Sequence, residues 1–308
     1  MIEVQNLTKR YGNLVAIDNV SFRVEHGEIL GFLGPNGAGK TTTMRIITGY
    51  MPPTNGSVRV ADFDIMEDPM KAKRLIGYLP ENPPLYNDMT VEGYLDFVAD
   101  LKKVSGKDKK SKLDLAMERC GIVNIRKRLI GNLSKGYRQR IGIAQAIVHD
   151  PLVLVLDEPT IGLDPRQIIE IRHLIKSLAG ERTVVLSTHI LPEVTMVCTR
   201  VIIINEGKIV LEESLERLSE RVEGAQVLFL KINYRSDEVK EKILSLDHVS
   251  HVTENAYGEF IIQTKGTVDI REELAKTIVQ NGWGLLEMRP LTHTLEDVFL
   301  RVISTEGE

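Results

Sequence analysis

Eight residues decide the fold of this chain: Gly34-Pro35-Asn36-Gly37-Ala38-Gly39-Lys40-Thr41. They match the pattern G-x-x-x-x-G-K-[ST]. They follow a short apolar stretch at 28–33 that reads as a strand and precede a stretch at 40–50 that reads as a helix. Glycines allow backbone N–H groups to turn inward around a phosphate, and the helix that begins there adds the positive end of its dipole. The sequence therefore predicts a phosphate-binding loop within an α/β fold.

The side chains at the end of this loop have expected tasks. Lys40 is predicted to place its charge on the β- and γ-phosphates of a nucleotide, and Thr41 offers a hydroxyl to Mg²⁺. Thr42, on the first helical turn, completes the predicted nucleotide contacts. The alternative is a glycine turn with a purely structural role. The pattern alone does not separate a kinase from a GTPase or an ATPase.

A second stretch ends in two acidic residues. Residues 152–156 are apolar throughout and read as a buried strand, and Asp157 and Glu158 follow directly. Ligands bind at the carboxyl ends of parallel strands. We therefore predict that Asp157 holds Mg²⁺, directly or through water, and that Glu158 orients or deprotonates an attacking water. An ordinary strand end with an acidic turn is the alternative.

His189 follows another strand pattern, at 183–187. A lone histidine is more often a surface or core residue than a catalytic one. Its place just past a buried strand brings it to the same sheet edge, and we predict that it contacts the γ-phosphate. The remaining histidines show no metal-ligand spacing and receive no function; they are His26, His149, His173, His248, His251 and His293.

The composition excludes several classes of protein. The chain has 308 residues and a formal net charge of −4, so no overall positive field points to nucleic acid. Its two cysteines, Cys120 and Cys198, do not make a disulfide framework. The longest apolar run around the middle of the chain, 152–156, is far shorter than the roughly 20 residues of a membrane-spanning helix, and the N-terminus lacks a signal-peptide pattern. We expect a cytoplasmic protein that reaches a membrane only through a partner.

Length and pattern predict two domains. Residues 1–222 alternate strand and helix patterns, including a strand at 74–79, and contain a helical subdomain at about 85–149. Within this subdomain, the lysine-rich stretch 102–112 is expected to be a solvated loop. Residues 223–308 follow the order β-α-β-β-α-β plus a last helix, which is the split βαβ pattern of a small accessory domain.

Residues 133–140 point to one family. They read Leu133-Ser134-Lys135-Gly136-Tyr137-Arg138-Gln139-Arg140 and lie shortly before Asp157. With the phosphate loop and the acidic strand end, this stretch resembles the LSGGQ signature of the nucleotide-binding subunits of ABC transporters, which ordinary kinases and GTPases lack. Ser134 can cap the helix that follows, and the start of that helix can receive a phosphate. The resemblance implies that Ser134, Lys135 and Gly136 receive a phosphate of ATP held by another subunit.

The resemblance covers about residues 1–220 and implies further roles. Tyr11 takes the position of the aromatic residue that stacks on adenine. Asp164 belongs to a loop that crosses the interface between two subunits. Glu158 takes the general-base position, and His189 takes the switch-histidine position.

The chain departs from the family pattern at three positions. Lys135 and Tyr137 stand where the family has glycine and glutamine, and Lys135 adds charge near the phosphate. Glu81 stands where the family has glutamine; its carboxylate can still reach Mg²⁺ or water, but it repels an approaching γ-phosphate. These variants, together with Thr294-Leu295-Glu296-Asp297-Val298-Phe299-Leu300, resemble the ABC-2 type subfamily, which includes drug, sodium, polysaccharide and gliding-related export systems.

The resemblance implies an ATP-hydrolysing subunit that drives export through a separate membrane permease and uses ATP and Mg²⁺. The expected fold is an α/β P-loop NTPase core with an antiparallel β subdomain and an α-helical subdomain, followed by a small C-terminal α+β domain. The expected partners are a second copy in a head-to-tail dimer, or a related ATPase subunit, and an integral membrane permease that holds the chain at the cytoplasmic face. Direct binding of nucleic acid is not expected.

Two other functions remain open. One is a soluble ABC ATPase that acts on nucleic acid or ribosomes, although this chain has neither the long coiled-coil insertion nor the second cassette of such proteins. The other is a small-molecule P-loop kinase, against which the signature stretch argues.

Overall fold

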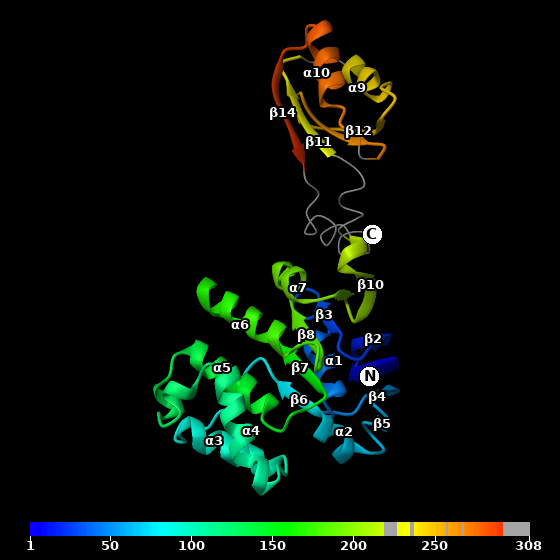
Figure 1. The fold of residues 1–308 in the computed structure, drawn as a ribbon. Coiled ribbons are helices and arrows are strands. Elements are labelled where there is room, and N and C mark those ends of the chain that lie inside the picture. Colours follow the sequence, from blue (N-terminus) through cyan, green and yellow to red (C-terminus); the bar gives the residue numbers. More distant parts are fainter. Residues whose placement is uncertain (219–226, 235–236, 257, 267, 292–308) are drawn as a thin grey trace. The chain divides into compact units, whose positions relative to one another are not determined.

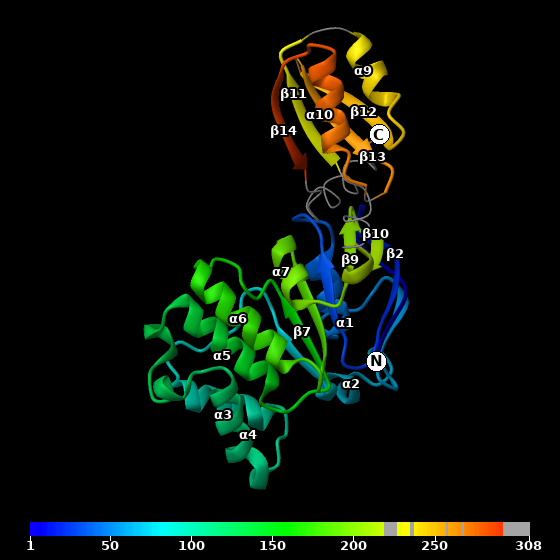
Figure 2. The ribbon, with the colours of Figure 1, turned by 45° about the horizontal axis from the view of Figure 1, so that its top comes forward.

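The computed structural model describes residues 1–218, 227–234, 237–256, 258–266 and 268–291. The chain divides into two compact units, Met1–Leu215 and Glu216–Glu308, and Figures 1 and 2 show the elements of each. The domain boundary predicted between residues 222 and 223 and the last predicted helix lie outside the described residues.

A mainly parallel sheet forms the centre of the first unit. Its strand order is β10-β9-β3-β8-β7-β6, in which β9 to β6 run parallel and β10 pairs antiparallel with β9. Every residue of β3, β7 and β8 is buried, which explains why these stretches are apolar without alternation. The strands are β3 (Ile29–Leu33), β6 (Ile76–Leu79), β7 (Val153–Asp157), β8 (Thr183–Thr188), β9 (Arg200–Asn205) and β10 (Lys208–Ser214).

An antiparallel sheet with the order β2-β1-β4-β5 accompanies the central sheet. The strand predicted at 74–79 begins only at Ile76, because residues Pro69–Leu75 form the helix α2. Pro69 lies in the first turn of α2, where the missing N–H of proline breaks no helical hydrogen bond. The strands of the antiparallel sheet are β1 (Ile2–Tyr11), β2 (Leu14–Val24), β4 (Asn55–Val60) and β5 (Phe63–Asp64).

The remaining helices of this unit follow the predicted helical stretches, with one correction. The solvated loop expected at 102–112 is wrong from residue 106 onward, because α4 begins there. One face of α4 is buried, while Lys109 on another face binds Asp96 and Asp100 at 2.7 Å each. The lysines therefore form the polar side of an amphipathic helix. The helices are α1 (Lys40–Ile47), α3 (Val91–Leu101), α4 (Gly106–Arg119), α5 (Lys135–Ile147), α6 (Pro165–Leu178) and α7 (Leu191–Val197), with 3-10 turns at Val123–Ile125 and Ile130–Asn132.

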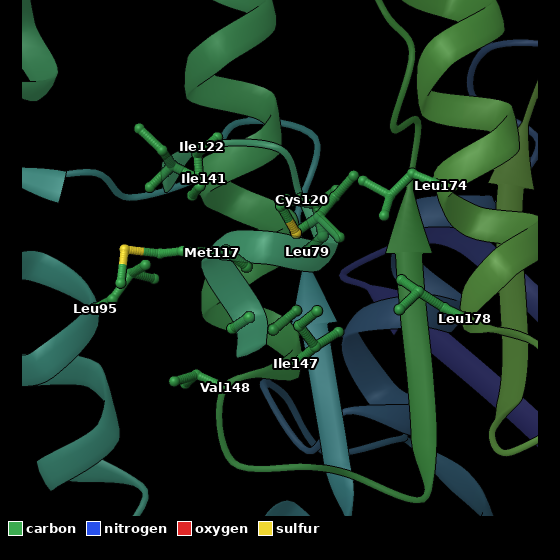
Figure 3. Close-up of a cluster of buried hydrophobic side chains, with 14 of the residues drawn as sticks. Leu79, Leu95, Met117, Cys120, Ile122, Ile141, Ile147, Val148, Leu174 and Leu178 are labelled. Atoms are coloured by element: carbon green, nitrogen blue, oxygen red, sulfur yellow. The ribbon is translucent and has the colours of Figure 1, made fainter. Parts of the chain in front are cut away.

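The two faces of the central sheet lie in two hydrophobic clusters. Val153 and Val155 pack in one cluster with α1 and the antiparallel sheet, whereas Leu154 and Leu156 pack in the other with α3, α4, α5 and α6. Alternate residues of a strand point to opposite faces, so a single apolar run supplies both clusters. Figure 3 shows the second cluster, in which side chains from β6 and these helices point toward one another.

The second unit contains β11 (Val227–Ile232), α9 (Asp237–Leu244), β12 (Val249–Ala256), β13 (Glu259–Thr264), α10 (Arg271–Gln280) and β14 (Leu285–Leu291). The strand order is β12-β13-β11-β14, and all neighbours are antiparallel. This is the predicted split βαβ arrangement. Its core combines alternate residues of the strands with one side of α9 and α10, for example Leu228, Phe260 and Leu274.

Candidate active site

The loop of residues 34–39 connects β3 to α1. Gly37 and Gly39 have φ angles of 83° and 105°, in the left-handed region that favours glycine. A Cβ atom at Gly39 would come within 2.7 Å of the carbonyl oxygen of Ala16, so a side chain does not fit there. Gly39 is also the N-cap of α1, and the first turn of α1 contains no acidic residue. The positive end of the helix therefore faces the loop without a neutralising carboxylate on its first turn.

Lys40 is the first residue of α1 and is 5% exposed. Its Nζ donates hydrogen bonds to the carbonyl oxygens of Gly34, at 2.8 Å, and Pro35, at 3.1 Å. The same atom lies 3.5 Å from the carboxylate of Glu158. The loop thus holds the ammonium group among oxygen acceptors, and phosphate oxygens can replace these acceptors.

Asp157 ends β7 beside the start of α1. The hydroxyl of Thr41 donates to Asp157 Oδ1 at 3.3 Å. The other carboxylate oxygen, Oδ2, is buried and has no hydrogen-bond partner among the described residues. Burial raises the pKa of Asp157, and the hydroxyls of Ser187 and Thr41 oppose this shift. The carboxylates of Glu158 and Glu81 raise the pKa further. Mg²⁺ prefers hard oxygen ligands, so an unpaired carboxylate oxygen next to a threonine hydroxyl fits this ion.

Glu158 stands directly after β7 with a φ of 49°, a backbone conformation that costs energy outside glycine. Its N–H donates to the carbonyl oxygen of Ser187 at 2.9 Å. Its carboxylate lies 2.9 Å from Nδ1 of His189. The side chain of Glu158 is 7% exposed and that of His189 is 37% exposed. The predicted base and the predicted histidine therefore form a pair at the carboxyl edge of the sheet.

A cavity of about 340 Å³ lies over this edge. It is lined by Asn36, Gly37, Gly39, Lys40, Thr41, Thr42, Glu81 and Glu158 of the predicted site, and by Ala16 and Ile161. Asp157 joins this group through Thr41, and His189 joins it through Glu158. Ala38 is buried within the loop, where its N–H lies 3.3 Å from the carbonyl oxygen of Pro35.

Tyr11 lies at the end of β1 and does not line this cavity. Its side chain is exposed, and its hydroxyl contacts the sulfur of Met51 at 3.1 Å. The ammonium group of Lys9 lies 5.5 Å from the centre of the Tyr11 ring. Contact of this ring with adenine stays a prediction.

The signature residues gather at a different place. Ser134 is the N-cap of α5, where its hydroxyl lies 3.5 Å from the N–H of Tyr137. Asp164 caps α6 and accepts from the N–H of Gln167 at 2.9 Å. A Cβ atom at Gly136 would meet the side chain of Gln167 at 2.6 Å, so the starts of α5 and α6 are close together. Lys135 is exposed beside Gly162.

These helix starts line a second cavity of about 600 Å³. Its lining includes Ser134, Gly136 and Asp164 but no residue of the phosphate loop. Within one chain, the described structure thus divides the predicted nucleotide contacts between two separate cavities.

A buried carboxylate near the Glu158–His189 pair was not predicted. Glu193 on α7 is 1% exposed and accepts hydrogen bonds from the hydroxyls of Thr160 and Thr188. No spacing pattern marks such a residue, because its partners come from separate elements. The signal in the sequence was an acidic residue in the otherwise largely apolar stretch Leu191–Val197.

The comparisons with known proteins agree with this geometry. The model of the ABC transporter family matches residues 17–161. A bacitracin transport ATP-binding protein of Bacillus licheniformis is 36% identical over 98% of this chain and 97% of its own length. A lantibiotic transport ATP-binding protein of Streptococcus pyogenes is 38% identical over 75% of this chain and 99% of its own length.

The chain belongs to the ABC transporter family.

Solved cassettes of this family have the same fold. A dimeric bacterial ABC transporter cassette has a TM-score of 0.64 and 28% identity, and covers 70% of this chain and 99% of its own. A dimeric cassette in a post-hydrolysis state with ADP and Pi has a TM-score of 0.64 and 26% identity, with the same coverage. The predicted P-loop NTPase fold is confirmed.

Family membership gives the chain its activity. It is an ATP-binding and ATP-hydrolysing subunit of an ABC transporter. The relatives give no support to the alternative function on nucleic acid or ribosomes. No helix in the described ranges is long and apolar enough to cross a membrane.

Proposed function

We propose that the cavity over the phosphate loop binds ATP together with Mg²⁺. The backbone of residues 34–39 surrounds the phosphates, and Lys40 exchanges its bonds to Gly34 and Pro35 for phosphate oxygens. Thr41 and Asp157 hold Mg²⁺, with Glu81 as a further oxygen ligand at the rim. When bound, Mg²⁺ neutralises the charge that develops on the phosphates. The unpaired, buried Oδ2 of Asp157 is the observation that supports this ion site.

Glu158 takes the proton of the attacking water in this proposal. Its carboxylate reaches the cavity from the buried end of β7, and the His189 ring, 2.9 Å away, limits its orientation. His189 is partly exposed, so its other nitrogen can contact the γ-phosphate. The in-line attack needs little covalent chemistry from the protein, since positioning and charge supply most of the catalysis of phosphoryl transfer.

The second cavity supplies the other half of the site. Ser134, Lys135 and Gly136 lie at the start of α5, and Asp164 lies at the start of α6. We infer that they contact the ATP held by the phosphate loop of a second subunit, in a head-to-tail pair. The separation of the two cavities within one chain supports this inference. Two subunits would then close around two ATP molecules and open after hydrolysis.

The transported substrate is an antimicrobial compound in this proposal, and the direction is export. The observation that carries it is the match along almost the whole chain to a bacitracin transport ATP-binding protein. A linearmycin resistance ATP-binding protein of Bacillus subtilis, 32% identical over 82% of both chains, agrees with this class. The permease would hold the subunit at the cytoplasmic face of the membrane. Residues 223–308 would form an accessory domain beside the ATPase domain at 1–222.

Drug susceptibility tests this function. The gene and its permease partner are deleted, and growth is measured in bacitracin, a lantibiotic and linearmycin. The deletion should lower the inhibitory concentration of at least one compound, and the wild-type pair should restore it. The Glu158→Gln variant should not restore it. Unchanged susceptibility to all three compounds would contradict the proposed substrate class.

A further inference from the structure

The carboxylate of Glu193 connects two loops that carry the reacting groups. Thr160 donates to one of its oxygens, and Thr188 donates to the other at 2.6 Å. Thr160 lies two residues after Glu158, and Thr188 lies directly before His189. All three connecting side chains are buried: Thr160 is 3% exposed, Thr188 is 0% exposed and Glu193 is 1% exposed.

A buried carboxylate is costly unless its oxygens are paired. Here each oxygen accepts a hydroxyl, and the guanidinium of Arg172 on α6 lies 3.8 Å from the oxygen that Thr160 contacts. An apolar side chain of similar volume often stabilises a protein core as well as a buried ion pair does. The arrangement therefore favours a role of Glu193 in fixing the positions of Thr160 and Thr188 over a role in stabilising the fold.

We propose that Glu193 is a positioning residue for ATP hydrolysis, which rests on the proposed roles of Glu158 and His189. Its two oxygens set the distance between the turn that follows β7, through Thr160, and the end of β8, through Thr188. That distance determines how the carboxylate of Glu158 lies relative to the ring of His189.

The backbone of Glu158 shows why such a connection is needed. With a φ of 49°, Glu158 holds a conformation that persists only where the surroundings impose it. The N–H of Glu158 donates to the carbonyl oxygen of Ser187 on β8. The hydroxyl of Thr160 holds the following turn through Glu193. Without that second anchor, the turn can relax and carry the carboxylate of Glu158 away from the attacking water.

The test compares two substitutions at Thr160. Thr160→Val keeps the size of the side chain and removes the hydroxyl, whereas Thr160→Ser keeps the hydroxyl. Thr160→Val should lower kcat by about 10- to 100-fold, the range expected for a displaced catalytic group, and leave KM for ATP unchanged. Thr160→Ser should retain most of the wild-type kcat. The control is Thr195→Val, since Thr195 is exposed on α7, the helix of Glu193, and its hydroxyl donates to the carbonyl oxygen of Pro192 in the same helix.

A double variant separates positioning from stability. In a Glu158→Gln background, Thr160→Val should add little further loss to the single-turnover rate, because the group that it positions has gone. A full additional loss in that background would overturn the proposal. So would a Thr160→Val enzyme with wild-type kcat, or one whose defect appears in KM.

The same measurements distinguish this inference from the function on which it rests. If Glu158→Gln itself turns over at the wild-type rate, the role of Glu158 is wrong. If Glu158→Gln is inactive while Thr160→Val is fully active, only the role of Glu193 is wrong. Thermal unfolding of each variant, measured in parallel, confirms that the assays compare folded proteins.

Discussion

The helices α1 and α5 both begin at a point suited to a phosphate, yet their surroundings differ. The start of α1 follows glycines without a side-chain cap, and it holds a 5% exposed lysine close to two buried acids, Asp157 and Glu158. The start of α5 is capped by Ser134, and Ser134 and Lys135 are exposed. The start of α1 is surrounded by groups that can take part in a reaction. The start of α5 presents groups that can bind a phosphate.

In the proposed function, this difference is the reason why one chain is insufficient. The cavity beside α1 is lined by the proposed base Glu158, by Lys40 and by the proposed metal ligands Thr41 and Glu81. The cavity beside α5 contains the hydroxyl of Ser134, while its two carboxylates have partners of their own: Asp164 caps α6, and Glu170 accepts hydrogen bonds from Arg140 and Arg166. Each cavity offers what the other lacks, so a second copy completes both.

The largest expected effect concerns Glu158, beside the start of α1. Glu158→Gln removes the base and keeps the size of the side chain, so ATP should still bind. Turnover, measured as phosphate release, should fall at least about 100-fold, the lower range for loss of a general base. ATP should also trap a dimer that light scattering detects. Glu118→Gln, on the exposed side of α4, is the matched control. Near-normal turnover would remove Glu158 from this role.

The comparison predicts a partial recovery when two inactive proteins are mixed. Lys40→Ala damages the α1 start, and Ser134→Arg damages the α5 start, so each protein alone should be inactive. A mixed dimer contains one doubly damaged site and one intact site, built from an intact Lys40 and an intact Ser134. Mixing should recover ATP-driven closure, and hydrolysis if one site can act alone.

Subunit exchange, followed with two fluorescent labels, is the control for this experiment. If Lys40 and Ser134 served one site within a chain, every site in the mixture would stay damaged. Loss of both closure and hydrolysis despite confirmed exchange would count against the shared site.

The same two helix starts show how far the sequence could predict the structure. The loop before α1 is local: the apolar strand, the glycines and the lysine that begins α1 are consecutive, so the pattern alone predicts their arrangement. The strand patterns at 152–156 and 183–187 were equally clear, because burial on both faces favours apolar residues without alternation, as at 153–156 and 184–186. The start of α4 was missed, because its lysines hid a buried face formed by Leu113, Ala116 and Met117.

Contacts between distant elements could not be predicted. Glu193 finds its partners on the turn after β7, at the end of β8 and on α6, and no spacing rule connects them. The pairing of Glu158 with His189 is likewise a consequence of β7 and β8 being neighbours. The family resemblance assigned roles to both residues, but only the fold brings their side chains to 2.9 Å.

The smallest expected effect concerns stability, and it separates the buried acid beside α1, Asp157, from an acid of the cavity beside α5, Asp164. Burial raises the pKa of Asp157, so the folded protein binds its proton more readily than the unfolded chain does. Stability then falls as pH rises from the unfolded pKa through the raised pKa, and the loss is complete above it. In EDTA near pH 7.5, Asp157→Asn should therefore raise the melting temperature, by roughly 2–4 °C for each kcal/mol that is regained.

Adding Mg²⁺ should reverse the order of the melting temperatures, so that wild-type protein melts at a higher temperature than Asp157→Asn. Wild-type protein should gain stability from the ion, because a ligand that binds only the folded state stabilises it, whereas Asp157→Asn should not. Asp164→Asn, in the cavity beside α5, is the matched control, since Asp164 caps α6 and asparagine caps helices as well as aspartate does. It should leave the pH dependence and the Mg²⁺ response unchanged. If Asp157→Asn keeps the wild-type response to Mg²⁺, the buried acid beside α1 is not an ion ligand. A metal site would then no longer distinguish the start of α1 from the start of α5.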